Sequence, residues 1–156
     1  RRWVNTQDFN LAPEAHHWYT QYANGSPGRF ARAVSSDLFS WHNQIDPMLS
    51  RAMRGDHPAG LGTLMSTLID GWASDWVKQG DKLGENRSKE AANHKAADMM
   101  LALVAQRAHM GLTDPSRSQA SLRTIDSITR ATESLRTNVS FKMVMEHLVA
   151  GISDKG

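Results

Sequence analysis

Residues 59–77, AGLGTLMSTLIDGWASDWV, carry the clearest periodic pattern in the chain. Their large apolar side chains recur every three or four residues, at Leu61, Leu64, Met65, Leu68, Ile69, Trp72 and Trp76. An α-helix completes a turn in about 3.6 residues, so this spacing gathers the apolar side chains on one helical face. We expect that face, with both tryptophans, to pack into the core of the domain.

Helical patterns also lie on both sides of this segment, and the alternation of apolar and polar residues that is typical of strands is missing. The expected helical segments are 13–23, 28–40, 41–54, 88–111 and 141–152, with one more helix that Asp114 and Pro115 open. The expected apolar face of that helix consists of Leu122, Ile125, Ile128, Ala131 or Thr132, and Leu135. The sequence therefore predicts an all-α protein whose body, residues 28–152, is an antiparallel helical bundle around one core.

Length and composition narrow the class of protein. The 156 residues suffice for one domain, or for one core with a short leading fragment. The absence of cysteine excludes disulfides and thiolate metal sites and suits a cytoplasmic protein. No apolar run reaches the roughly 18 residues of a membrane span, and the opening RRWVNTQDFN lacks the apolar region of a signal peptide. Because the chain begins without methionine, we expect it to be a piece of a longer protein.

Residues with catalytic or metal-binding chemistry form no specific motif, so we expect neither a metal site nor a catalytic residue. The chain contains no phosphate-binding P-loop and no HExxH zinc motif. His94 and Asp98 are four residues apart and could contact one ion, but two solvated polar residues are the favoured interpretation. An enzyme that uses a histidine–carboxylate pair stays open as an alternative.

A helical nucleic-acid-binding module is a second alternative. The net charge of +2 permits contact with nucleic acid without arguing for it. Phosphates would be contacted by the arginines of 117–136 and by five residues of the segment 78–95. Those five are Lys78, Lys82, Arg87, Lys89 and Lys95. Acidic residues alternate with them, so a solvated face of mixed charge is the favoured interpretation.

The residues NGSPGR, 24–29, form the sharpest turn signal in the chain. Asn24 and Gly25 can end one helix, because both tolerate the left-handed backbone conformation. Ser26 can cap the next helix, and Pro27 fits its first turn. The free N–H groups of that helix would lie near Arg29, which is an arrangement that can bind an anion. A simple corner between two helices has the same local sequence and is favoured when only these residues are considered.

Two segments resemble bacterial DNA polymerase III delta-prime subunits, which are clamp-loader proteins of the AAA+ class. ANGSPGRFARAV, residues 23–34, is similar to the Gly-Ser-Pro-Gly segment in the lid of these subunits. SLRTIDSITRATESLRTNVSFKMVMEHLVAGI, residues 121–152, resembles the end of their helical collar domain. The two segments frame a helical stretch of the length expected for a collar.

The resemblance implies a domain organisation and a role for the turn. Residues 1–40 would be the end of the AAA+ lid, and residues 41–156 the helical collar or oligomerisation domain. The turn would face nucleotide through Gly25, Ser26, Pro27, Gly28 and Arg29. Active clamp-loader ATPases have arginine at the position of Gly28, so the chain matches the delta-prime type and its own ATP hydrolysis is in doubt. A gamma/tau-type subunit is the alternative within the family. ATP and Mg²⁺ would belong to neighbouring AAA+ modules, and this fragment itself would hold no cofactor.

The resemblance also implies partners. Collar domains hold the subunits of a clamp loader together, and the whole complex loads the sliding clamp onto primed DNA during DNA replication, without a membrane. The expected contacts with other clamp-loader subunits involve Trp41, Met48, Leu135, Phe141 and Met145. Apolar residues near the start of the chain are also more than short helices easily bury, and an assembly would cover them. These residues are Trp3, Trp18, Trp41, Met48 and Met53.

Overall fold

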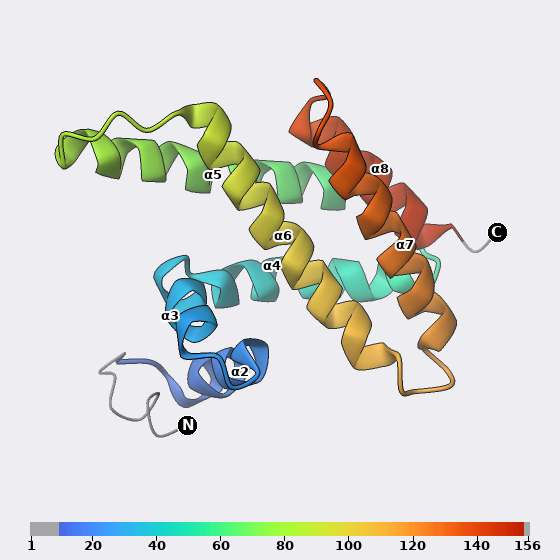
Figure 1. The fold of residues 1–156 in the computed structure, drawn as a ribbon. Helices are drawn as coiled ribbons and strands as arrows, with labels where there is room; N and C mark the ends of the chain where they lie inside the picture. The colour runs from blue at the N-terminus through green and yellow to red at the C-terminus, as the bar shows by residue number, and fades with distance from the viewer. Residues whose placement is uncertain (1–9, 155–156) are drawn as a thin grey trace. The chain divides into compact units, whose positions relative to one another are not determined.

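The computed structural model describes residues 10–154, and the described chain is helical, without strands (Figure 1). The predicted all-α class is therefore confirmed. The first three of the seven described helices are α2 (Pro13–Ala23), α3 (Pro27–Ser35) and α4 (Leu38–Met53). The other four are α5 (Leu61–Lys82), α6 (Lys89–Gly111), α7 (Ser118–Ser134) and α8 (Phe141–Ser153).

The described helices belong to two compact units. The N-terminal unit ends at Gln44 and the C-terminal unit begins at Ile45, so α4 contributes to both. The assignment of residues 1–40 to an AAA+ lid and of 41–156 to a collar stays a prediction. Trp3, which was expected to need a covering partner, lies outside the described residues.

Aromatic side chains fill the centre of the N-terminal unit, where α2 packs on α3. Trp18 stacks on Tyr22 with ring centroids 5.2 Å apart, and Tyr19 contacts Phe30 at 6.0 Å. The Phe39 N–H donates a hydrogen bond to the Tyr19 hydroxyl oxygen at 3.1 Å. Burial raises the pKa of Tyr19. The unit thus gathers several of its large side chains in its own interior.

The four long helices of the C-terminal unit form a closed circuit of contacts. α5 packs against α6 and α8, and α7 packs against the same two helices. α7 and α8 lie side by side (Figure 1). The largest fully buried side chains of these helices are Leu61, Met65, Ile69, Met100, Val104, Met145, Leu148 and Ile152. Among these four helices, α5, α6 and α8 therefore supply the large core side chains, and Ile45 and Leu49 of α4 are fully buried in the same unit.

The structure corrects the expected burial of the two tryptophans in α5. The buried stripe follows Leu61, Met65, Ile69 and Ala73 at a spacing of four residues. Trp72 and Trp76 are half-buried beside this stripe and stack on each other at 6.0 Å. The guanidinium of Arg87 lies 4.4 Å from the centroid of the Trp76 ring, and the Lys95 ammonium lies 5.1 Å from it. Two cations thus cover part of Trp76 in addition to the stacked Trp72 ring.

The structure also corrects the expected apolar face of α7. Ser121, Thr124 and Ser127 point inward and are buried with Ala131, whereas Leu122 is 59% exposed. Ile125 and Ile128 are half-buried, while Ala131 and Leu135 are buried as expected. The Thr124 and Ser127 hydroxyls donate to the carbonyls of Ala120 and Arg123, so their burial leaves both donors satisfied.

Close contact between helices explains this reversal. A Cβ added to Gly151 of α8 would lie 2.5 Å from the Ser127 hydroxyl oxygen, and one added to Gly111 of α6 would collide with Ser121. The backbones of α6 and α8 therefore lie too near α7 for large side chains to fit between them. The larger apolar residues of α7 are displaced to its flank and its outer surface.

Arg123 ties α7 to the C-terminal ends of two other helices. Its Nε donates to the Ile152 carbonyl in the last turn of α8 at 2.8 Å. Its Nη2 donates to the Met53 carbonyl at the end of α4 at 2.9 Å. A cation at these positions also opposes the negative end of each helix dipole.

We expect Arg123→Ala to lower the free energy of unfolding by about 2–4 kcal/mol, because two hydrogen bonds from a charged donor are lost. Urea denaturation followed by circular dichroism measures this change. Arg136→Ala, which removes an exposed arginine two residues beyond α7, is the matched control and should change stability by less than about 0.5 kcal/mol. Equal stability of the two variants would contradict the assigned role of Arg123.

The helix contact at Gly151 gives a second prediction. Gly151→Ala should lower stability by about 1–3 kcal/mol, because the new methyl group meets the Ser127 hydroxyl. Gly71→Ala, within α5, places its methyl group in open space and should raise stability by up to about 1 kcal/mol. Adding Ser127→Ala to Gly151→Ala should restore part of the loss. The close-packing explanation fails if both single alanine variants are stabilised equally.

Candidate functional site

The predicted turn of residues 24–29 joins two helices in the N-terminal unit. α2 ends at Ala23, and Asn24 and Gly25 follow with φ values of 46° and 84° in the left-handed region. The Ser26 hydroxyl accepts a hydrogen bond from the Arg29 N–H at 3.2 Å, and Pro27 is the first residue of α3. The predicted end of the first helix, the start of the second and the serine cap are confirmed. The second helix was predicted to run to residue 40, but α3 ends at Ser35 and α4 begins at Leu38, so that prediction was wrong.

Two arginine side chains lie near the start of α3: Arg29 belongs to its first turn, and Arg32 reaches back from its last turn. The Arg29 guanidinium lies over the Tyr22 ring, 4.4 Å from its centroid, so it contacts α2. The Arg32 guanidinium covers Gly28, since a Cβ on that glycine would lie 3.3 Å from Arg32 Nη1. The turn itself is exposed at Gly25, Ser26, Pro27, Gly28 and Arg29. The structure thus brings two positive charges and a helix N-terminus to one exposed corner, which can attract an anion.

A pocket of about 240 Å³ lies on the α2 side of this corner. Its lining consists of Thr20, Gln21, Ala23, Asn24, Gly25, Ser26, Pro27 and Phe30. Neither Arg29 nor Arg32 lines it. The pocket therefore combines small polar groups with the apolar side chains of Ala23, Pro27 and Phe30, and it lacks a charged group.

The five expected interface residues differ in their exposure. Met145 is fully buried, and Trp41 and Leu135 are only 6% and 7% exposed, so their side chains pack inside this chain. Met48 and Phe141 are partly exposed. Phe141 at the start of α8 contacts the His94 ring edge-on at 5.1 Å. Of the five expected interface residues, Met48 and Phe141 are therefore the two that a partner could contact.

The structure exposes other apolar residues that the sequence pattern did not single out for a partner. Among the described residues, the large apolar side chains that are exposed are Leu83, Met110, Leu112, Leu122 and Met143. Of the residues near the chain start that were expected to need covering, Trp18 is half-buried in the aromatic centre and Met53 is 8% exposed. The start of the described chain therefore exposes less apolar surface than its composition indicated.

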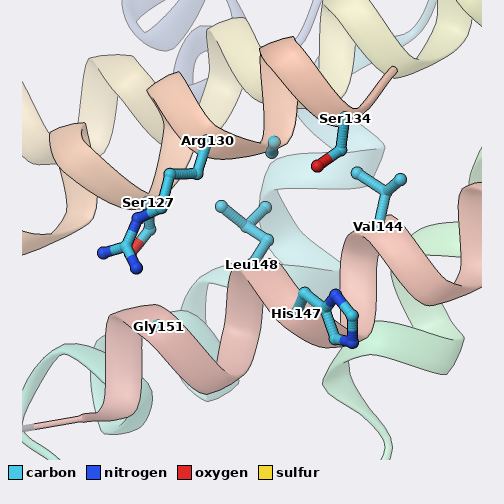
Figure 2. A pocket seen from close by; sticks show the side chains of 8 residues that line it. Ser127, Arg130, Ser134, Val144, His147, Leu148 and Gly151 are labelled. Carbon is cyan, nitrogen blue, oxygen red and sulfur yellow. The ribbon is translucent and has the colours of Figure 1, made fainter. Parts of the chain in front are cut away.

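A second pocket, of about 300 Å³, lies between α7 and α8 (Figure 2). α7 contributes Ser127, Arg130, Ala131 and Ser134, and α8 contributes Val144, His147, Leu148 and Gly151. The Arg130 guanidinium lies beside Ser127, and the His147 ring lies beyond Leu148 (Figure 2). Arg130 also pairs with Asp126 on the same helix. The side chains of Arg130 and His147 therefore do not converge on one point. Because residues of two helices line the pocket, the sequence pattern alone did not indicate it.

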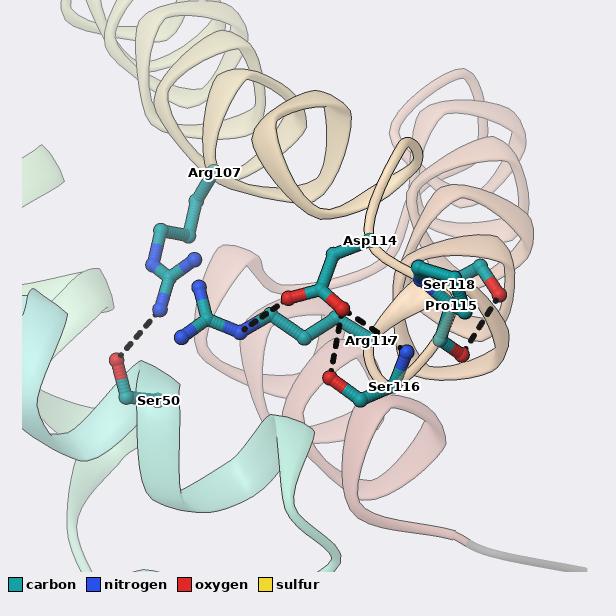
Figure 3. Close-up of polar contacts among 7 residues, drawn as sticks. All are labelled: Ser50, Arg107, Asp114, Pro115, Ser116, Arg117 and Ser118. Carbon is teal, nitrogen blue, oxygen red and sulfur yellow. Dashed lines mark hydrogen bonds and ion pairs between the residues drawn. The ribbon is translucent and has the colours of Figure 1, made fainter.

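Arg107 and Asp114 make polar contacts that hold helices and a loop of the C-terminal unit in place (Figure 3). Arg107 of α6 forms an ion pair with Asp46 at 3.2 Å and donates to the Ser50 hydroxyl at 3.1 Å. In the loop before α7, Asp114 accepts hydrogen bonds from the Ser116 hydroxyl at 2.7 Å and from the Ser116 N–H at 2.9 Å. These bonds lower the pKa of Asp114, the hydroxyl contact contributing most. Each of these carboxylates thus stabilises a helix contact or a turn.

Two cations of the segment 78–95 form ion pairs with carboxylates. Arg87 pairs with Glu85 at 2.7 Å, and Lys89 pairs with Asp70 at 2.8 Å. Within residues 10–154, no three histidine, aspartate or glutamate side chains gather where they could hold a metal ion. These contacts favour the interpretation of this face as one of mixed charge.

The resemblance to clamp-loader subunits is carried by two short segments, residues 23–34 and 121–152. No protein-family model, curated protein or solved structure matches the chain. Among the described helices, none is both long and apolar enough to cross a membrane.

Arg29→Ala should leave the chain folded, because Arg29 is exposed and contributes one cation–π contact, with the buried Tyr22 ring. We expect the midpoint of thermal unfolding to fall by no more than about 4 °C, as for the loss of one cation–π contact. A thermal melt followed by circular dichroism, with Arg32→Ala as the control, measures this. A larger drop for Arg29→Ala alone would assign this residue to the fold rather than to a binding corner.

Proposed function

We propose that the chain is the C-terminal part of a DNA polymerase III clamp-loader subunit of the delta-prime type. In this role it mediates subunit assembly of the cytoplasmic complex that loads the sliding clamp onto primed DNA. Residues 1–40 would end the AAA+ lid, and 41–156 would form the collar as an antiparallel bundle. The observation that carries the proposal is the capped turn at 24–29, whose sequence is similar to the lid segment of these subunits and whose Arg29 lies at an exposed helix N-terminus.

The division of the chain into two units supports the proposal. The capped turn belongs to the N-terminal unit, and the segment 121–152, which resembles the end of a collar, belongs to the C-terminal unit. The division between Gln44 and Ile45 lies four residues after the boundary expected between lid and collar. A lid end and a collar are two separate modules, so two compact units fit this organisation.

The proposed mechanism is mechanical. The C-terminal unit has a closely packed core and several polar ties, so it can hold a constant shape while neighbouring ATPase modules move. Hydrolysis of ATP by this subunit is not part of the proposal, because Gly28 occupies the position of the arginine of active clamp-loader ATPases. ATP and Mg²⁺ would be bound by the neighbouring modules.

Size-exclusion chromatography with light scattering tests the proposal. The chain is run alone and then with the collar domains of the other clamp-loader subunits from the same organism. We expect a stable mixed complex, because collar domains assemble with one another. A monomer that ignores these partners would overturn the proposal. If that monomer also retained DNA at moderate salt, the nucleic-acid-binding alternative would replace it.

Matched variants locate the contact surface within the same experiment. Met48→Glu and Phe141→Glu place a charge on the two partly exposed interface candidates and should weaken the mixed complex at least about tenfold. Leu83→Glu places the same charge on a side chain that is 68% exposed in the α5–α6 connection and should leave the complex unchanged. Equal effects of all three variants would remove Met48 and Phe141 from the interface.

A further inference from the structure

The pocket between α7 and α8 follows the helical repeat of both helices. Within each helix, its four lining residues have the spacing i, i+3, i+4 and i+7, starting at Ser127 in α7 and at Val144 in α8. Residues with this spacing share one face of a helix over two turns, so the pocket extends for about 10 Å along the pair. Ser127 meets Gly151 at one end, and Ser134 lies at the other (Figure 2). The pocket is therefore a groove between two helices.

Small and apolar side chains form the floor of this groove. Ala131, Val144 and Leu148 line it, although they are only 5%, 2% and 2% exposed. Apolar surface continues past the lining, because Met143 is 50% exposed and lies one turn before His147 on α8. A small ligand inside the pocket would leave this methionine in water, whereas a larger partner would cover it. The apolar surface therefore favours a macromolecular partner.

The two walls of the groove carry basic side chains that lie apart. Arg130 on α7 and His147 on α8 are exposed and do not converge on one point (Figure 2). Arg130 pairs with Asp126, but both side chains are 66% exposed, and such surface pairs contribute little to stability. The guanidinium has five N–H donors and can bind a second carboxylate, and the imidazole donates from at least one nitrogen in either protonation state. Each wall therefore offers its own donor to an acidic group.

We infer that the groove between α7 and α8 binds an acidic amphipathic helix of a partner protein. The apolar stripe of such a helix recurs every three or four residues, which matches the repeat of the groove. Acidic residues on the two sides of that stripe meet Arg130 and His147. One small anion would leave one of these two side chains unused. The inference does not rest on the proposed function, whose interface candidates are Met48 and Phe141.

Titration of the chain with designed peptides tests this inference. The probe is an amphipathic peptide of about 16 residues, with leucine and alanine every three or four residues and glutamate on both flanks. A control peptide carries lysine at each glutamate position. Fluorescence anisotropy of the labelled peptides measures affinity, and the amide shifts of the chain in NMR spectra locate the contact. We expect saturable binding of the acidic peptide, with shifts concentrated in residues 127–134 and 144–151. Binding of the lysine peptide should be at least about tenfold weaker.

Variants on the two walls have a matched control outside the groove. Arg130→Glu and His147→Glu place negative charge on opposite walls, and each should weaken binding of the acidic peptide at least about fivefold. Arg136→Glu makes the same charge change as Arg130→Glu at an exposed residue that does not line the pocket. It should change the affinity by less than about twofold. All three residues are exposed, so we expect each variant to stay folded, which circular dichroism verifies.

Four results would overturn the inference. The first is the absence of saturable binding of the acidic peptide. The second is an equal effect of Arg130→Glu and Arg136→Glu, because net charge rather than the groove would then attract the peptide. The third is tighter binding of octanoate than of the peptide, which would make the groove a small-ligand pocket. The fourth is a dependence of the groove shifts on chain concentration without peptide, because a second copy would then occupy it. None of these results involves clamp-loader partners, so the groove and the proposed function fail separately.

Discussion

The guanidinium of Arg123 is the contact on which the arrangement of the C-terminal unit depends. It leaves α7 and binds one carbonyl at the end of α4 and another in the last turn of α8. The ends of helices have carbonyls without intrahelical partners, and burying them unpaired is costly. One side chain therefore satisfies the ends of two helices and fixes the position of both relative to α7. The ion pair of Arg107 with Asp46 adds a second tie between α4 and α6.

Small residues allow these ties to form at short range. Gly111 and Gly151 let α6 and α8 approach the serine-lined side of α7, where a larger side chain would separate the helices. The buried hydroxyls of Thr124 and Ser127 bond to carbonyls of their own helix, so these two donors are satisfied inside the unit. Large apolar side chains of α5, α6 and α8 supply the volume of the core instead. The close packing of the helix backbones thus allows the Arg123 side chain to reach the ends of α4 and α8.

The N-terminal unit is built on a different principle. Stacked and edge-on aromatic rings fill its interior, and the turn at Asn24 and Gly25 reverses the chain between α2 and α3. This arrangement leaves the first turn of α3 exposed with two arginines beside it. α4 contributes to both units: its first residues contact the aromatic interior, and its last residues are held by the polar ties of the C-terminal unit.

The sequence by itself determined the features that depend on neighbours a few residues away. Helical periodicity was sufficient for the all-α class, and Asn24, Ser26 and Pro27 were sufficient for the end of α2 and the start of α3. Only the tertiary structure decided which face of α7 is buried, because Gly111 and Gly151 act on this helix from two other helices. The partial exposure of Trp76 depends in the same way on Arg87 and Lys95. The pocket between α7 and α8 likewise exists only once the two helices pair. Local bonding follows from residue type and spacing, whereas burial depends on how closely distant backbones approach, which periodicity does not encode.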